Sequence, residues 1–296
     1  MKQIQPMRHD DCPPSLQALQ RPKQGTPTMG GVFVLGVAVG VAGLFGGFSG
    51  PSGWIVFGTM VGVGLVGVVD DLWKLRGAQA TGLRCLPKLL AVLAIGLVAG
   101  LGLSHPSLGP RQEWVPWLGR PMTLGWAWVP LAALVITGSA HAVNLTDGMD
   151  GLAAGCLAIA FTALGLLAAQ TPTVMVWCLS LAGACAGFLW FNAHPASVFL
   201  GDVGALGLGA ALGVLALVSH AALALLIVGG VFVAEAVSVM VQVASYRWRN
   251  KKRIFRVAPL HHHFQLGGIG EQKLVVRFWI VGLLLAALGV TALRHS

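Results

Sequence analysis

The chain has 296 residues, of which 56% are apolar and only 10% are charged, and its mean hydropathy is +0.78. Soluble domains carry about 25% charged residues, so the composition excludes an ordinary soluble domain. The net charge of +9 would suit a protein that binds nucleic acid. The positions of the basic residues, however, indicate a membrane topology instead.

Apolar stretches recur along the chain, and most are long enough to cross about 30 Å of hydrocarbon as an α-helix. The sequence therefore predicts an all-α, polytopic membrane bundle of about nine transmembrane helices. These would form one integral-membrane domain over 30–296, preceded by a basic cytoplasmic arm over 1–29 and containing a long cytoplasmic loop over 245–273. The predicted spans are 30–48, 53–69, 86–103, 124–143, 151–169, 173–191, 203–218, 221–244 and 274–293.

The lysines and arginines indicate how the bundle is oriented. If the N-terminus is cytoplasmic and nine spans alternate, every lysine and arginine except Arg111, Arg120 and Arg294 lies on the cytoplasmic side. This asymmetry is the positive-inside pattern of membrane proteins. The basic excess is thus explained by topology, so no nucleic-acid partner is expected, and the C-terminus is predicted to lie outside.

Pairs of glycines four residues apart occur in several of the predicted spans. Such small-xxx-small spacing is typical of helices whose backbones approach closely in a membrane. We therefore interpret these glycines as packing residues rather than as parts of a chemical site. The pairs are Gly36/Gly40, Gly58/Gly62, Gly96/Gly100 and Gly209/Gly213.

Most of the ten acidic residues gather at the predicted cytoplasmic ends of the spans. The block VVDDLWK (68–74) ends an apolar run with two adjacent carboxylates, and such a pair is stabilised by a cation between its members. Glu235 is an exception because it falls inside the apolar run 221–244. Five of the six cytoplasmic acids stand in three compact blocks, so one bundle could bring them together. The five are Asp70, Asp71, Asp147, Asp150 and Asp202, and the sixth, outside the blocks, is Glu271.

Two further blocks have the residue types that bind phosphate groups. In NLTDGMDGLA (144–153), Asn144, Asp147 and Asp150 recur every three residues, which places them near one face of a helix. The glycines beside them permit close approach of a ligand. In GDVG (201–204), Asp202 opens a predicted helix whose free N–H groups suit an anion or a metal-bridged phosphate. Helix capping alone would explain one of these aspartates but not the whole pattern.

Three consecutive histidines stand in FRVAPLHHHFQLGG (255–268). Neighbours on a helix point about 100° apart, so only one or two of the imidazoles could face the same site. A zinc site would also need cysteine or histidine at loop spacings, which the sequence lacks. We favour contact of one or two imidazoles with phosphate or sugar, with a plain surface cluster and a zinc site as the alternatives.

Taken together, these residues favour phosphoryl transfer. Oxygen ligands at helix ends suit Mg²⁺ or Mn²⁺ better than softer metals. Carboxylates, a divalent cation, lysines and glycine-rich turns are the groups that position and neutralise phosphates. The sequence offers no convincing Ser-His-Asp or Cys-His arrangement.

The blocks named above, with KQGTPTMGG (23–31), FNAHPASVFLGDVGALGLG (191–209) and VVRFWI (275–280), closely resemble the phospho-N-acetylmuramoyl-pentapeptide transferase family. The resemblance runs in order from about residue 23 to the C-terminus. GTPTMGG and PLHHHF are specific to that family, whereas the aspartate blocks are shared with the wider group of polyprenyl-phosphate sugar-1-phosphate transferases. The family has ten helices, and this chain begins within the arm that follows the first.

The resemblance implies an Mg²⁺-dependent enzyme of the bacterial inner membrane with its active site on the cytoplasmic face. It would transfer phospho-N-acetylmuramoyl-pentapeptide from a UDP-linked donor to undecaprenyl phosphate and release UMP, the first membrane step of peptidoglycan synthesis. The implied metal ligands are Asp202, the principal one, and Asp71. Asp70 would be the base or the partner of the lipid phosphate, and His261 would contact the diphosphate or sugar. Substrate contacts would come from Lys23, Thr28, Lys74, Lys88, Asn144, Asp147, Asp150, Asn192, Phe199, His262 and His263.

A phosphate monoester with a second pKa of about 6 is mostly dianionic at pH 7, so proton removal by Asp70 would contribute little. We therefore favour direct attack by the lipid phosphate over a covalent aspartyl-phosphate route. The chain departs from the family pattern at His141, Ala205 and Gln265, none of which is an implied metal ligand. A second copy of the chain or membrane lipid would cover the flank left by the missing helix.

Three alternatives remain at this stage. The first is a transferase of N-acetylglucosamine phosphate, which the PLHHHF block disfavours. The second is a transporter, which would bury polar residues near the membrane midplane and show internal repeats. The third is an inactive scaffold, which the complete set of aspartates disfavours.

Overall fold

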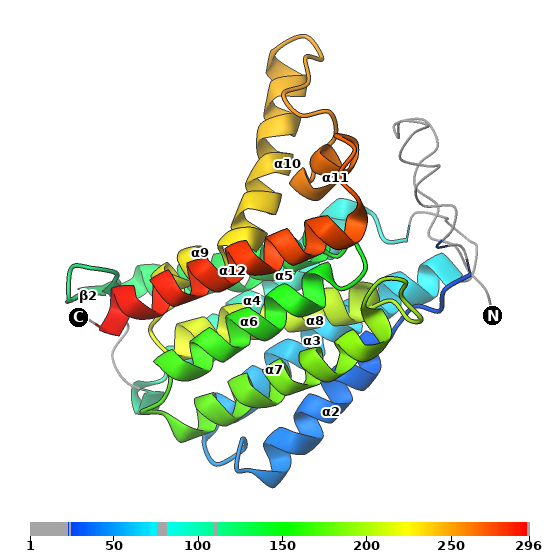
Figure 1. Cartoon of the computed structure of the whole chain (residues 1–296). Coiled ribbons are helices and arrows are strands. Elements are labelled where there is room, and N and C mark those ends of the chain that lie inside the picture. The colour runs from blue at the N-terminus through cyan, green and yellow to red at the C-terminus, as the bar shows by residue number, and fades with distance from the viewer. Residues whose placement is uncertain (1–22, 24, 76–81, 109–111, 295–296) are drawn as a thin grey trace.

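The computed structural model describes residues 23, 25–75, 82–108 and 112–294. The chain is almost entirely helical, as the sequence predicts, and its long helices lie side by side in one bundle (Figure 1). The helices are α2 (Gly31–Leu44), α3 (Pro51–Leu75), α4 (Cys85–Leu103), α5 (Trp128–Thr146), α6 (Leu152–Leu167), α7 (Pro172–Asn192), α8 (Gly201–Val218), α9 (Ala222–Val228), α10 (Gly230–Trp248), α11 (Leu260–Gln265) and α12 (Glu271–Arg294). Two single turns of 3₁₀ helix, Pro106–Leu108 and Gly125–Ala127, flank a short hairpin of β1 (Gln112–Val115) and β2 (Arg120–Thr123).

The number of spans is smaller than the nine predicted when helix length is the criterion. Six helices of the described chain are long and apolar enough to cross a membrane, and a bent pair raises the number to seven. The shorter apolar helices α2 and α6 occupy the other two predicted positions. The chain is thus a polytopic helical membrane protein, but two of its apolar segments form helices too short to satisfy that criterion.

The predicted span 221–244 is not one straight helix. It divides at Gly229 into α9 and α10, whose axes differ by 84°. In Figure 1, α10 stands away from the bundle, and α11 lies beside it. The predicted loop 245–273 is partly helical, because it includes the end of α10, all of α11 and the first residues of α12.

Helix α8 is the centre of the bundle. It packs most extensively against α3 and α5, and 94% of its apolar window is buried within the protein. Small residues make this possible: a Cβ at Gly204 would lie 2.7 Å from the Cα of Gly31, and one at Gly67 would lie 2.4 Å from the carbonyl oxygen of Asp202. These contacts hold the start of α8, with Asp202, against the last turns of α3.

The glycine pairs divide into two groups. Gly96/Gly100 and Gly209/Gly213 face neighbouring backbone closely, with contacts of 2.7–3.1 Å from an added Cβ. This confirms the packing interpretation for α4 and α8. Among the described residues, a Cβ at Gly36, Gly40 or Gly58 would meet nothing within 4 Å, and one at Gly62 would make only ordinary contact with Ile95. Gly36, Gly40 and Gly58 therefore do not pack closely against the described part of the chain.

Candidate active site

Three carboxylates meet where the end of α3 faces the start of α8. Asp70 and Asp71 do not end their helix as the predicted span 53–69 implied, because α3 continues to Leu75 and carries both into the interior. Asp70, Asp71 and Asp202 are 0%, 2% and 6% exposed. One carboxylate oxygen from each lies within 4.8 Å of the others. We call these three residues the aspartate cluster.

Two lysines neutralise much of the charge of the aspartate cluster. Nζ of Lys74 lies 2.7 Å from Oδ2 of Asp70 and 3.1 Å from Oδ2 of Asp202. Nζ of Lys88, on α4, lies 3.0 Å from the same oxygen of Asp202 and 3.5 Å from Asp70. Three acids face two lysines, so the cluster retains a net negative charge.

Backbone and amide groups fix the orientation of each carboxylate. The N–H of Leu83 donates to Oδ1 of Asp70 at 2.6 Å, and the N–H of Val203 donates to Oδ2 of Asp71 at 3.2 Å. Nδ2 of Asn144 donates to Oδ1 of Asp202 at 3.1 Å. The three carboxylates are therefore held in position by α3, α5 and α8 and by the residues before α4.

Glycine allows the chain to pass close to this cluster. Gly201 has a φ of +75°, a left-handed conformation that favours glycine. A Cβ at this residue would lie 2.8 Å from both Oδ2 of Asp71 and Oγ1 of Thr28. Thr28, one of the predicted substrate contacts, thus lies beside the aspartate cluster.

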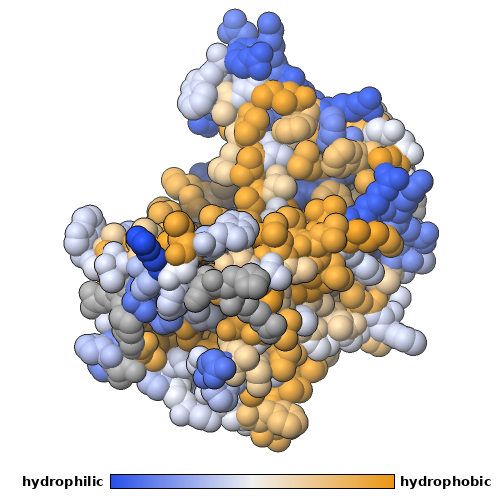
Figure 2. All heavy atoms as spheres, turned by 60° about the vertical axis from the view of Figure 1, so that its left-hand side comes forward, coloured by the Kyte–Doolittle hydropathy of each residue, from blue (hydrophilic) through white to orange (hydrophobic). Residues whose placement is uncertain are grey.

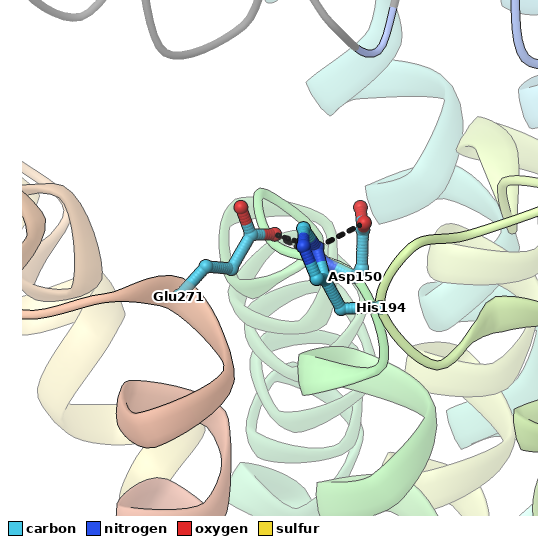
Figure 3. Close-up of side chains that lie close together, drawn as sticks. All are labelled: Asp150, His194 and Glu271. Atoms are coloured by element: carbon cyan, nitrogen blue, oxygen red, sulfur yellow. Dashed lines mark hydrogen bonds and ion pairs between the residues drawn. The ribbon is translucent and has the colours of Figure 1, made fainter.

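A second group of polar side chains joins three distant segments (Figure 3). Asp150 follows α5, His194 follows α7, and Glu271 opens α12; together they form a further cluster with metal-ligand spacing. Nδ1 of His194 lies 2.9 Å from Oδ2 of Asp150, and the N–H of Asp150 donates to Oε1 of Glu271 at 2.8 Å. We call these three residues the second cluster. Neither His194 nor Glu271 was among the predicted site residues.

Lys23 ties the arm before α2 to the second cluster. Its Nζ lies 2.8 Å from Oδ1 of Asp150 and also pairs with Oε1 of Glu271. The arm is held by backbone hydrogen bonds that run beside Phe199: its N–H donates to the oxygen of Pro27, and its own oxygen accepts from Gly30. The part of the predicted arm over 1–22 and residue 24 lies outside the described residues.

Asp147 lies between the two clusters, and Asn192 binds the backbone beside the second cluster. The side chain of Asn192 accepts from the N–H of Gly151 at 3.1 Å and donates to the oxygen of Val198 at 2.9 Å. Burial, and then the negative charges of Asp202 and Asp71, raise the pKa of Asp147 to about 7. The charges of Lys23 and Asp150 also affect the pKa of Asp147. Asp147 is therefore close to both clusters.

The three histidines have three different environments. His261 is fully buried, and its Nδ1 lies 3.2 Å from Oε2 of Glu235. Burial, and then the neighbouring His261, lower the pKa of His262 to about 3, so this imidazole is neutral at pH 7. His263 contacts its own loop instead: Nδ1 accepts from the N–H of Arg256. Neither of the metal-competent groups found among the described residues includes any of the three.

Glu235 is a residue that the sequence marked as unusual but did not assign. It is 0% exposed, and its carboxylate accepts from the N–H of His261 at 3.1 Å. A Cβ at Gly148 would lie 2.3 Å from Nε2 of His261, which places that nitrogen against the NLTDGMDGLA block. Glu235 therefore holds the histidine segment against the end of α5.

Two sequence models of known families match this chain. Residues 53–220 match the sequence model of glycosyl transferase family 4, and residues 23–35 match phospho-N-acetylmuramoyl-pentapeptide-transferase signature 1. The first match includes the aspartate cluster, and the second includes Lys23 and Thr28.

Several curated proteins are similar over most of the chain. The phospho-N-acetylmuramoyl-pentapeptide-transferase of Pelobacter propionicus is 42% identical over 92% of this chain and 81% of its own length. That of Solidesulfovibrio magneticus is 41% identical over 94% and 82%, and that of Thermodesulfovibrio yellowstonii is 40% identical over 92% and 81%. The chain belongs to the phospho-N-acetylmuramoyl-pentapeptide-transferase family.

Proposed function

We propose that this chain transfers phospho-N-acetylmuramoyl-pentapeptide from its UDP-linked donor to undecaprenyl phosphate and releases UMP. Family membership supports the reaction, and the observation that carries it at the level of residues is the aspartate cluster with Lys74 and Lys88. Acids and lysines interleaved at one end of a membrane bundle are suited to hold two phosphorylated substrates. Neither a transporter nor an inactive scaffold would need these acids and lysines at one end of the bundle, so their grouping favours the transferase.

The aspartate cluster also fits a magnesium ion. Its donors are hard carboxylate oxygens, they converge within 4.8 Å, and their charge exceeds that of the two lysines. Asp202 and Asp71 would hold Mg²⁺, with Asp70 beside them. When bound, the ion would supply positive charge against the diphosphate of the donor.

Lys74 and Lys88 would position the phosphates. In this structure both ammonium groups contact the carboxylates of Asp70 and Asp202, and each can turn a free N–H toward a bound phosphate oxygen. An oxygen of the lipid phosphate would attack the β-phosphorus of the donor, and the bond from that phosphorus to the bridging oxygen would break. UMP would leave with the bridging oxygen. Asp70 would organise charge around the attacking phosphate rather than remove a proton.

The second cluster would bind the nucleoside end of the donor. Lys23 and Asp150 present a cation and a carboxylate there. Asn192 ends α7, and Phe199 lies in the loop that follows it, together with His194. Phe199 is half-buried and would stack on uracil. Asn144 and Asp147 would line the passage between the clusters, and neutral His262 would donate or accept a hydrogen bond rather than supply charge.

The site would face the cytoplasm of a bacterial cell from the inner membrane. The 245–273 segment carries the three histidines together with Arg247, Arg249, Arg256 and further basic residues, and basic loops remain cytoplasmic in membrane proteins. A soluble UDP-linked donor would reach the site from that side.

The decisive experiment is a UMP-release assay with purified protein in detergent, undecaprenyl phosphate, Mg²⁺ and either of two donors. UMP should form with UDP-N-acetylmuramoyl-pentapeptide and not with UDP-N-acetylglucosamine. Release with only the second donor would assign the chain to the N-acetylglucosamine branch. Uptake of a donor into vesicles without UMP release would instead indicate a transporter.

A further inference from the structure

Helix α10 turns away from the bundle and exposes one side, while Val231, Phe232, Glu235 and Ser238 near its start are buried. Its axis is bent by 84° from that of α9, and in Figure 1 it crosses the direction of the nearly parallel long helices. Because those helices span the membrane, α10 lies along the membrane plane rather than across it. A helix of this orientation with an exposed apolar side suits the boundary between headgroups and acyl chains.

The exposed side of α10 is apolar along its length. Met240 is 62% exposed, Val243 is 48% exposed and Trp248, at the end of the helix, is 84% exposed. Tryptophan is enriched where a protein meets the membrane interface, because its ring is apolar and its N–H is polar. Figure 2 shows this apolar part of α10 in orange beneath a hydrophilic tip in blue.

The tip is strongly basic. Its cations are all exposed, and no acidic residue occurs in the sequence between Glu235 and Glu271. Within the described part of the chain, none of these cations has an ion-pair partner. We define the basic tip as Arg247, Arg249, Lys251, Lys252 and Arg253.

The tip has a defined shape because the chain folds back onto α10. Oε1 of Gln242 accepts from the N–H groups of Ile254 and Phe255, each at 3.0 Å, and its Nε2 donates to the oxygen of Phe255. Oγ of Ser245 donates to the oxygen of Lys252 at 2.9 Å. These bonds hold the basic residues at the end of the apolar helix rather than on a free loop.

A shallow hollow lies beside the basic tip. Its volume is about 250 Å³, and its walls are apolar, with Arg249 among the residues that line it. An apolar hollow beside a cation suits a molecule that has both a hydrocarbon part and an anionic part. The lining residues are Val241, Ala244, Ser245, Trp248, Arg249 and Ile254.

We propose that the basic tip and this hollow bind an anionic phospholipid of the surrounding membrane. The headgroup phosphate pairs with Arg249 and the neighbouring cations, and the acyl chains cover the exposed side of α10. Free phosphate would account for the cations but not for the exposed Met240, Val243 and Trp248. A soluble acidic partner would likewise leave the exposed apolar side of α10 uncovered. This proposal does not depend on the reaction that the enzyme catalyses.

Quenching of Trp248 by brominated lipids tests the proposal. The full chain is reconstituted in nanodiscs that contain the same mole fraction of acyl-brominated phosphatidylglycerol or acyl-brominated phosphatidylcholine. The contribution of Trp248 is obtained by difference from Trp248→Phe. We expect phosphatidylglycerol to quench it about twofold more strongly, because anionic lipid concentrates at a basic surface.

A matched pair of triple variants shows whether the basic tip is responsible. Arg247→Gln, Arg249→Gln and Arg253→Gln together should remove most of the preference. Arg84→Gln, Lys273→Gln and Arg277→Gln, which neutralise three exposed cations elsewhere, should leave it intact. Equal quenching by both lipids, or equal loss in both triple variants, would overturn the proposal. Protection of Trp248 from both lipids would overturn it as well, since that result would show another protein surface on the tip. An unchanged Tm confirms that each variant is folded.

Discussion

Glu235 and His261 form a fully buried contact between α10 and α11. Oε2 of Glu235 lies 3.2 Å from Nδ1 of His261, and Oε1 accepts from the backbone N–H of the same histidine. The bond to the backbone N–H and the carboxylate beside Nδ1 hold the ring with Nε2 toward Gly148. Glu235 thus sets the position of His261.

Glu235→Gln should lower the turnover number by about tenfold or more, the usual effect of losing a carboxylate that orients a functional histidine. The amide oxygen can still accept from the backbone N–H, so the protein should remain folded. The measurement is UMP release at saturating donor. Ser238→Ala is the control. It removes a buried hydroxyl that donates to the backbone carbonyl oxygen of Glu235, not to its carboxylate. Full turnover in Glu235→Gln would contradict the orienting role.

Asp202→Asn should reduce UMP release at least about a hundredfold, because a metal ion in the cluster is worth several kcal/mol of charge stabilisation. Mg²⁺ should also raise the Tm of the wild type more than that of the variant, since a ligand stabilises only a state that binds it. Near-normal turnover at low Mg²⁺ would show that Asp202 is not the principal ligand.

Gly201→Ala should destabilise the protein by roughly 1–3 kcal/mol and lower activity, because an alanine at a φ of +75° is strained. Its Cβ would also crowd Asp71 and Thr28 at 2.8 Å. Gly183→Ala is the matched control, since a Cβ there meets nothing within 4 Å in the middle of α7. Equal unfolding midpoints in the two variants would exclude this account of Gly201.

Phe199→Ala should raise the KM for the UDP-linked donor more than it lowers kcat. A stacking ring contributes binding that is similar in the ground state and the transition state, and its loss therefore affects KM. The check is a steady-state titration of the donor at saturating lipid phosphate. An unchanged KM with a collapsed kcat would assign Phe199 to another role.

Glu113 lies in the β1–β2 hairpin, whose strand β2 is labelled in Figure 1. Its burial should make the stability of the protein depend on pH. Burial raises the pKa of this hairpin residue from 4.5 to about 8, even though the N–H of Ala222 donates to its carboxylate. Between these values the folded chain holds a proton that the unfolded chain releases. The free energy of unfolding therefore falls as pH rises through this window, by up to about 1.4 kcal/mol per pH unit.

Glu113→Gln removes this contribution. The Tm of the variant relative to the wild type should rise steadily from pH 5 to pH 8 and then level off, as measured by thermal unfolding in detergent. A difference that is constant across this range would show that Glu113 does not titrate there.

The sequence was sufficient to predict the all-helical membrane class and the grouping of acids, because hydropathy and charge report directly on burial and on membrane side. It did not predict the break between α9 and α10, since the run 221–244 is apolar throughout. Gly229 and Gly230 were its only local signal. Helix lengths were overestimated at α2 and α6 because apolar residues continue into the turns that end both helices.

The site was only partly predictable for a related reason. Asp70, Lys74 and Asp202 belong to blocks whose composition indicates phosphate chemistry, whereas Lys88 belongs to none of them and was implied only by the family resemblance. The partners His194 and Glu271 lie in segments whose contacts depend on tertiary packing. Glu235 was recognisable as an isolated acid in an apolar run, but its partner lies 26 residues away on a separate helix. His194, in the block FNAHPA, and Glu271, at the start of α12, carried weaker local signals.

Helix α8 is almost wholly enclosed by the rest of the protein, although it is as long as a span. Changes in bilayer thickness or lateral pressure act first on the outer helices, such as α4 and α12, which bury only about a third of their apolar windows. Those helices can tilt or slide to match the bilayer. Asp202 stands on the most deeply buried of the candidate spans, so such a movement reaches its carboxylate through its neighbours, among them Lys88 on α4.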